Sequence, residues 1–307
     1  MPGASVLVAH EGKPFLRRVC GQSNLELAIE VTPETNFRLA SLTKQFTAAA
    51  ILVLVQDERL SIDDPVLRWL PSLPSPSRQA TIRQLLTHTS GIIDYEELIP
   101  DGPSAQLSDA DVLALLESQH TTYFAPGSAY RYSNSGYALL ALVVERAAAE
   151  RFAKFLHDRI FIPLGMSSTV AHEEGVTRIA NRAFGYSCRN GEWVRNDQSP
   201  ASAVLGDGGI YSSIDDLAKW DAALYDSSLL ADQSRRLAFT AHTSTDLHHV
   251  HYGFGWRVTG ELLWHSGETV GFRNVIMRNP GRRLTVVILT NRDEQLPYEK
   301  MMTQMVG

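Results

Sequence analysis

Residues 38–55 read RLASLTKQFTAAAILVLV, which joins an S-x-x-K turn directly to a long apolar, helix-like run. On a helix, residues three apart share a face, so the Ser41 hydroxyl and the Lys44 amine are expected side by side. A serine hydroxyl becomes a nucleophile when a base takes its proton, and a lysine is that base when burial or charge lowers its pKa. The alternative is a helix start in which Ser41 caps backbone N–H groups and Lys44 is solvated.

The composition is that of a globular protein with a sizeable core: 307 residues, 44% apolar, 20% charged, with a formal charge of −6. No basic surface points to nucleic acid. Cys20 and Cys188 are too few for a disulfide framework and have no metal-ligand spacing. No apolar run is long enough to span a membrane. No signal peptide opens the sequence, which leaves an intracellular protein or an exported one whose export segment is missing here.

Strand-like patterns occur at both ends of the chain and helix-like patterns in the middle. The expected strands are 4–9, 14–19, 25–31, 253–258, 262–265, 273–278 and 284–289. The expected helices are 43–60, 82–86, 108–118, 137–150, 152–161 and 215–225. The simplest architecture is an α/β (α+β) fold: one antiparallel sheet from both chain ends, flanked by helices, with an inserted, mostly helical domain. We predict a discontinuous sheet domain of residues 1–63 and 206–307 and a helical domain of residues 64–205.

A second group of polar residues, YRYSNSG at 130–136, lies between two helical patterns and is expected to form a loop. A phenol such as Tyr132 near an amine shuttles protons to a leaving group. Asn134 offers both a donor and an acceptor to a substrate amide. The alternative is a Tyr-rich turn followed by a helix-capping asparagine.

A third group, WHSGE at 264–268, ends a strand-like run near the C-terminus. Gly267 at the end of a strand allows a ligand backbone to approach closely. Edge-strand N–H groups pair with an extended substrate or point at a developing oxyanion. His265 is equally consistent with a histidine whose hydrogen bonds are satisfied within the strand.

Other candidate sites are weaker. The glycine-rich residues 205–210 suggest tight packing near a site but lack phosphate-loop spacing, so nucleotide binding is not expected. For His248, His249 and His251, a solvated loop is favoured over a metal site. No serine lies in G-x-S-x-G, which argues against an α/β-hydrolase. We expect neither a metal nor a cofactor.

The three motifs occur in order: S-x-x-K at a helix start, Y-x-N in the helical middle and H-x-G after a late strand. In this order the chain resembles the superfamily of serine β-lactamases and penicillin-binding proteins. The resemblance is strongest to its class C-like branch of DD-peptidases, D-aminopeptidases and carboxylesterases. Stretches similar to the framework of that branch cover nearly the whole chain, at residues 85–92, 161–166, 208–213 and 289–292.

The resemblance implies a role for each motif. Ser41 is the acylated nucleophile, Lys44 is its proton partner, and Tyr132 activates Ser41 or protonates the leaving group. Asn134 positions the substrate, and the third motif lines the cleft from the sheet side with His265, Ser266 and Gly267. The backbone N–H groups of Ser41 and Glu268 form the oxyanion hole. Whether Lys44 or Tyr132 is the general base stays open.

Two features depart from the family pattern. His265 stands where β-lactamases usually carry lysine, and a neutral imidazole attracts a substrate carboxylate less than an ammonium does. The helix that usually precedes the first strand is absent and the tail after Arg292 is short, which leaves a truncated chain or a covering partner as alternatives.

The expected function is that of a cofactor-free serine hydrolase working through an acyl-enzyme on an amide, a β-lactam or an ester. Peptidase or esterase activity ranks above β-lactamase activity. The alternative is a catalytically silent ligand sensor or scaffold of the penicillin-binding type. The expected partner is a small-molecule or peptide substrate, and a homo-oligomer is left open.

Overall fold

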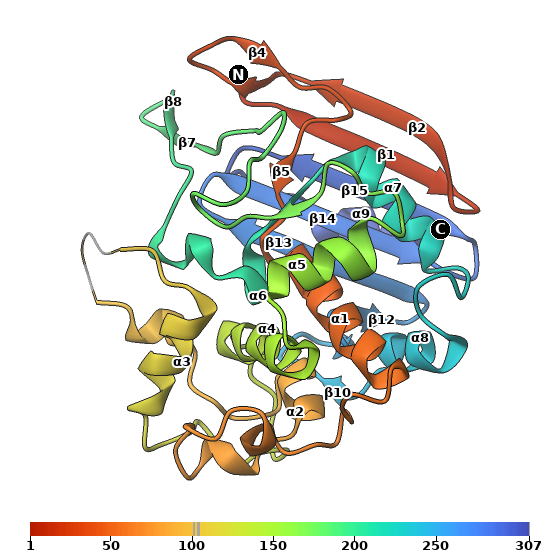
Figure 1. Ribbon diagram of the computed structural model, residues 1–307. Coiled ribbons are helices and arrows are strands. Elements are labelled where there is room, and N and C mark those ends of the chain that lie inside the picture. Colours follow the sequence, from red (N-terminus) through yellow and green to blue (C-terminus); the bar gives the residue numbers. More distant parts are fainter. Residues whose placement is uncertain (101, 103–104, 307) are drawn as a thin grey trace.

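The computed structural model describes residues 1–100, 102 and 105–306, and its largest element is an eight-stranded antiparallel sheet (Figure 1). The strand order is β10-β11-β12-β13-β14-β15-β1-β2. The bounds are Thr243–Ser244 (β10), His251–Tyr252 (β11), Arg257–Thr259 (β12), Leu262–Thr269 (β13), Phe272–Asn279 (β14), Leu284–Thr290 (β15), Ala4–His10 (β1) and Lys13–Cys20 (β2). Because β15 pairs with β1 along its whole length, the two ends of the chain meet inside one sheet. The predicted sheet is confirmed.

Alternation of side chains gives this sheet two apolar faces, each with its own core. One face, which includes Leu7, Ile276 and Val287, packs under the helical layer. The opposite face, which includes Trp264 and Met277, packs under the C-terminal helix α9 (Tyr298–Val306). The short tail expected after Arg292 therefore forms a helix that covers part of the sheet.

The helical layer is centred on α1 (Lys44–Gln56), whose residues are buried from Lys44 to Leu54. This burial on all sides explains the continuous apolar run, because α1 is surrounded by other elements, with most contacts to α4 (Asn134–Ala148) and α6 (Leu205–Gly208). The other helices are α2 (Ile82–Leu86), α3 (Asp109–Glu117), α4 (Asn134–Ala148), α5 (Phe152–Leu156), α6 (Leu205–Gly208), α7 (Ile214–Ala223) and α8 (Asp232–Phe239). Figure 1 shows α2, α3 and α4 below the sheet and α7 beside β1 and β15.

The smaller sheets are β3–β4, β5–β9–β6 and β7–β8. Their strands are Gln22–Asn24 (β3), Ile29–Glu30 (β4), Phe37–Arg38 (β5), Val170–Ala171 (β6), Tyr186–Arg189 (β7), Glu192–Arg195 (β8) and Ile210–Ser212 (β9). The sheet β5–β9–β6 joins the segment before Ser41 to β9, which directly follows the glycine-rich segment of α6, and so brings two distant parts of the sequence to the site.

Three expected elements differ from the structure. The strand expected at 25–31 is wrong, because the chain turns at Ala28, whose φ is +53°, and leaves only the short β3 and β4. The strand expected at 253–258 begins only at Arg257. Gly255 precedes it with φ +75°, and a Cβ atom there would lie 2.6 Å from the Lys44 carbonyl oxygen. The helix expected at 152–161 ends as α5 and continues as a π-helical turn, His157–Phe161.

None of the helices in the described ranges is long and apolar enough to cross a membrane. The division into a sheet domain of residues 1–63 and 206–307 and a helical domain of residues 64–205 stays a proposal.

A buried ion pair between Asp221 and Arg278 links α7 to the sheet. Arg278 Nε on β14 donates to Asp221 Oδ1 on α7 at 2.6 Å, and both side chains are 1% exposed. The Thr285 hydroxyl on β15 donates to the same oxygen at 2.7 Å. Two buried charges of this kind stabilise a fold only as a pair, since either one alone is strongly unfavourable in an apolar interior.

Asp221→Ala is expected to lower the free energy of unfolding by about 3–5 kcal/mol, because it leaves the Arg278 guanidinium buried without a counter-charge. Urea unfolding followed by circular dichroism measures the change. Asp215→Ala on the same helix is the control: its partner, Arg17, is 45% exposed, so a loss of under about 1 kcal/mol is expected. Equal losses in the two variants would contradict the structural role of the buried pair.

Candidate active site

Ser41 lies in a 3-10 turn, η1 (Ala40–Thr43), that leads directly into α1. The turn begins at Ala40, whose φ of +50° falls in the left-handed region that residues with side chains rarely adopt. Backbone strain of this kind is found most often at functional sites. The sharp turn presents Ser41 at the surface of a pocket, at the N-terminal end of the buried helix.

Lys44 is completely buried beside Ser41. Its Nζ atom donates to Ser41 Oγ at 3.1 Å, to Asn134 Oδ1 at 2.7 Å and to the Asp207 main-chain oxygen at 3.0 Å. These contacts use all three donors of an ammonium group. The alternative of a solvated lysine is therefore wrong, and the expected hydroxyl–amine contact is present.

Asn134 is the first residue of α4, and its side chain connects α1 with the 3-10 turn η4 (Tyr95–Leu98). Its Oδ1 accepts from Lys44, and its Nδ2 donates to Glu96 Oε1 at 3.0 Å. The backbone N–H of Asn134 donates to Asp94 Oδ2 at 2.9 Å. The Asp94 carboxylate therefore accepts from the first backbone N–H group of α4, and the Asn134 side chain does not. The alternative in which Asn134 caps the helix is wrong.

Tyr132 lies against Lys44 and is not among the residues that line the pocket. The Lys44 Nζ is 5.0 Å from the centre of the Tyr132 ring. The His88 ring packs against Tyr132 with 4.2 Å between centroids and a tilt of 32° between the ring planes. Burial, and next the charge of Lys44, holds the pKa of His88 well below its ordinary value of 6.5. A neutral, buried His88 thus supports the ring of Tyr132 without adding charge.

His265 on β13 is buried, at 1% exposure. Its Nδ1 donates to the Ser266 carbonyl oxygen at 2.6 Å, and its Nε2 accepts from the Tyr252 hydroxyl at 2.9 Å. Burial, and next the positive charge of Arg257, holds the pKa of His265 well below its ordinary value of 6.5. The imidazole is therefore neutral, and both of its nitrogens are hydrogen-bonded, as in the alternative of a histidine whose hydrogen bonds are satisfied within the fold. His265 does not line the pocket.

Gly267 lies where β13 passes the turn that carries Ser41. A Cβ atom at this position would lie 2.1 Å from the Leu39 carbonyl oxygen, so only glycine permits the approach. The next residues of the strand, Glu268 and Thr269, line the pocket, whereas Ser266 and Gly267 do not. The close approach thus brings the backbone of β13 alongside Ser41.

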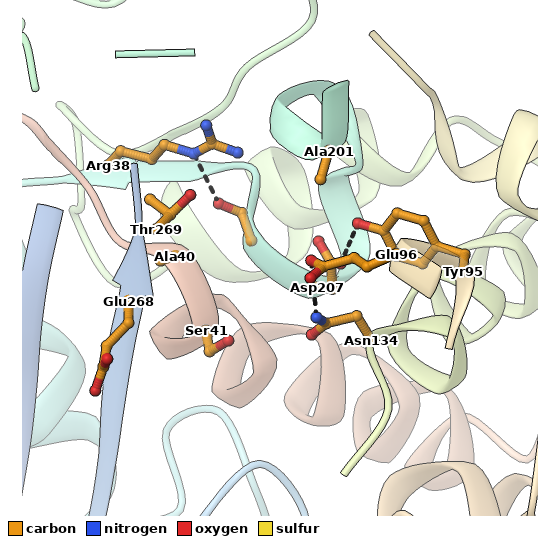
Figure 2. Close-up of a pocket in the computed structure, with 11 residues that line it drawn as sticks. Arg38, Ala40, Ser41, Tyr95, Glu96, Asn134, Ala201, Asp207, Glu268 and Thr269 are labelled. Atoms are coloured by element: carbon orange, nitrogen blue, oxygen red, sulfur yellow. Dashed lines mark hydrogen bonds between the residues drawn. The ribbon is translucent and has the colours of Figure 1, made fainter. Parts of the chain in front are cut away.

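The pocket has a free volume of about 40 Å³ and is open to solvent on one side. Figure 2 shows Ser41 facing Asn134, Glu96 and Asp207 across it, with Glu268 on the sheet side. Its lining residues are Arg38, Ala40, Ser41, Tyr95, Glu96, Asn134, Ala201, Asp207, Gly208, Glu268 and Thr269.

Several pocket residues were missed from the sequence, Glu96 and Asp207 among them. The signals that could have found them are the acidic run at 94–97 directly after a framework stretch, and the lone acid among the glycines at 206–209.

Asp207 is the most deeply placed acid of the pocket. Its side chain is 5% exposed, and Oδ2 accepts from the Tyr95 hydroxyl at 2.8 Å. Burial raises the pKa of Asp207 to about 7, although the charge of Lys44 partly offsets the effect. Burial and the charge of Asp207 also raise the pKa of Tyr95, so its phenol stays a hydrogen-bond donor.

Comparisons with known proteins agree with this geometry. A family model for β-lactamases matches residues 1–305. The chain is 31% identical over 315 residues to penicillin-binding protein 4* of Bacillus subtilis (strain 168), covering 96% of this chain and 69% of that protein. It is 28% identical to a D-aminopeptidase of Gluconobacter oxydans (strain 621H), covering 94% of this chain and 56% of that protein. It superposes on the octameric penicillin-binding protein homologue from Pyrococcus abyssi with a TM-score of 0.88 and 27% identity, covering 97% of this chain and 71% of that one.

The chain belongs to the β-lactamase family, since the family model spans nearly all of it and a relative is 31% identical over most of its length. With a D-aminopeptidase among its relatives, it is a serine hydrolase of that family. The resemblance inferred from the three motifs is thus confirmed. The alternative of a silent sensor or scaffold finds no support in these relatives.

Proposed function

We propose that the protein hydrolyses amide or ester bonds through an acyl-enzyme on Ser41. The observation that carries the proposal is the 3.1 Å contact between Lys44 Nζ and Ser41 Oγ beside the pocket. When Lys44 is neutral, its lone pair accepts the Ser41 proton while Oγ bonds to the substrate carbonyl carbon. The tetrahedral intermediate then expels an amine or alcohol, which takes up a proton, and leaves the acyl group on Ser41. Water attacks this ester, releases the acid and restores the Ser41 hydroxyl.

Tyr132 and the oxyanion hole complete the proposed chemistry. Tyr132, whose ring centre lies 5.0 Å from Lys44 Nζ, is proposed to pass a proton to the leaving group. The direct contact of Lys44 with Ser41 favours Lys44 as the base of the first step. The backbone N–H groups of Ser41 and Glu268 are proposed to bind the oxyanion, and the close packing of Gly267 on Leu39 supports this. Each such donor contributes about 2.7–4 kcal/mol of transition-state stabilisation.

The proposed substrates are amides or short peptides of D-amino acids and simple esters, ahead of β-lactams. His265 supports this order, because a buried, neutral imidazole offers no positive charge to a substrate carboxylate. The D-aminopeptidase relative supports it independently. Asn134 is proposed to position the substrate. Its side-chain amide now bonds to Lys44 and Glu96, and in the complex it would also hydrogen-bond to the substrate amide.

Acylation and substrate choice can be tested together on the wild-type protein. A fluorophosphonate is expected to add one label, which peptide mapping by mass spectrometry places on Ser41. Short-chain p-nitrophenyl esters and D-alanyl p-nitroanilide are expected to be hydrolysed at least about tenfold faster, in kcat/KM, than nitrocefin. Folded protein that takes up no label at Ser41 would contradict the acyl-enzyme, and faster turnover of nitrocefin would contradict the order of substrates.

Assembly into a homo-oligomer is proposed on one observation, the octameric state of the Pyrococcus abyssi homologue.

A further inference from the structure

His88 contacts the segment that carries Tyr132 on both sides of that tyrosine. Its main-chain oxygen accepts from the backbone N–H of Arg131 at 3.0 Å, and its Nδ1 atom accepts from the backbone N–H of Ser133 at 3.2 Å. Its ring packs against the Tyr132 ring between these two contacts. Residues 131–133 belong to neither a helix nor a strand, so their backbone N–H groups depend on partners of this kind. His88 therefore holds both neighbours of Tyr132 as well as its ring.

The hydrogen bond from Ser133 defines the protonation state of the His88 imidazole. A ring nitrogen that accepts a hydrogen bond carries no proton, so the ring is neutral and its proton is on Nε2. Burial, and next the charge of Lys44, lowers the pKa of His88 well below 6.5, which keeps Nδ1 available as an acceptor. The Nε2 atom is buried and has no hydrogen-bond partner among the residues that the structure describes. This tautomer thus satisfies the Ser133 N–H group and leaves its own N–H group unpaired.

The backbone of His88 is also unfavourable for a residue with a side chain. Its φ is +57°, and it directly follows Thr87, the C-cap of α2, at a position where helices most often have glycine. The unpaired, buried Nε2–H group is a second cost to stability. Strained residues of this kind persist where their surroundings hold them, and they gather at functional sites. Both costs fall on a residue that holds Tyr132, which points to a role in the reaction.

We propose that His88 is a positioning residue for Tyr132, holding its segment so that the phenol is in place for proton transfer to the leaving group. The proposal rests on the proposed function, in which Tyr132 passes that proton. His88 is 2% exposed and does not line the pocket, so it acts through Tyr132 and not on the substrate. The position must be exact, because a shift of about 1 Å in a reacting group can lower a rate about 10²-fold.

Two kinds of leaving group separate this role from a general effect on the fold. An anilide nitrogen must gain a proton to leave, whereas p-nitrophenolate leaves as an anion. His88→Phe keeps a ring against Tyr132 but removes the acceptor for Ser133. It is expected to lower kcat/KM at least about 30-fold for D-alanyl p-nitroanilide and less than about threefold for a short-chain p-nitrophenyl ester.

His88→Asn is the conservative variant. The asparagine side-chain oxygen can take the place of Nδ1 as the acceptor for Ser133, and asparagine tolerates a positive φ. Anilide activity within about fivefold of wild type is therefore expected, although the ring is lost.

A double-mutant cycle tests whether His88 acts through Tyr132. Tyr132→Phe alone is expected to lower kcat/KM for the anilide at least as much as His88→Phe does. Adding His88→Phe to the Tyr132→Phe protein is expected to cost less than about threefold more. Circular dichroism checks that each variant is folded. If His88→Phe does not fold, His88→Gln replaces it, because the glutamine amide lies one carbon further from the backbone than that of asparagine.

His249→Asn is the matched control, since His249 also has a positive φ, +60°, but is exposed and does not line the pocket. It is expected to keep wild-type activity on both substrates. Equal losses on the anilide and the ester, equal losses in His88→Phe and His88→Asn, or losses that multiply in the cycle would overturn the positioning role. The fluorophosphonate label on wild-type Ser41 is unaffected by these outcomes, so the failure of this proposal and the failure of the hydrolase function are distinguishable.

Discussion

Ser41→Ala is expected to lower kcat/KM for a short-chain p-nitrophenyl ester or D-alanyl p-nitroanilide by at least about 10⁴-fold. The reason is chemical: Oγ is the atom proposed to bond to the acyl group, and alanine offers no nucleophile in its place. The structural cost is small, because within the described residues the hydroxyl makes one hydrogen bond, to Lys44 Nζ. The expected variant is folded, unlabelled by a fluorophosphonate and inactive.

Steady-state kinetics, circular dichroism and mass spectrometry check this result on one preparation. Ser128→Ala is the control, since the exposed Ser128 hydroxyl donates to the Ala125 carbonyl oxygen and does not line the pocket. It is expected to keep wild-type activity and labelling. If Ser41→Ala retained more than about a tenth of the wild-type activity, another residue would have to be the nucleophile.

Lys44→Arg is expected to lower kcat about 10³-fold or more while the protein stays charged at this position. Lysine can lose its proton and act as a base, whereas the guanidinium of arginine stays protonated in proteins. Arginine therefore preserves the charge that faces Asp207 and Asn134 but removes proton transfer. Lys44→Met, which is apolar and of similar length, is expected to be equally inactive and also less stable, because Asn134 Oδ1 and the Asp207 carbonyl oxygen lose their donor.

Pre-steady-state measurement of the acylation rate separates this step from hydrolysis of the acyl-enzyme. Lys219→Arg is the matched control: Lys219 is partly exposed, donates to Asp216 and the Gly165 carbonyl oxygen, and does not line the pocket. Near-normal acylation by Lys44→Arg would assign the first proton transfer to Tyr132 instead.

The sequence predicted those features that depend on local pattern. The apolar run after Lys44 predicted a helix, and its burial on all sides follows from that composition. The spacing of Ser41 and Lys44 predicted the contact between their side chains. Alternating apolar residues at 4–9 and 284–289 predicted strands of one sheet, and these two strands are neighbours.

The remaining features depend on contacts between distant residues, which local pattern does not encode. The strand pattern at 25–31 was overridden by a turn at Ala28. The direction of the His265 side chain depends on Tyr252, which lies on another strand. Glu96 and Asp207 reach the pocket because Asn134 and Tyr95 hold them there, through partners 38 and 112 residues away in the sequence.

The pairing of β1 with β15 also determines the order in which the protein can be assembled during synthesis. Translation delivers β1 and β2 well before residues 284–290, which pair with β1 and follow after more than 250 intervening residues. Until then the β1–β2 hairpin has an unpaired edge that can join the strands of other chains. Contacts of such long sequence separation slow folding. A nascent chain stalled before β15 is therefore an aggregation hazard, even though every residue that lines the pocket has already been made.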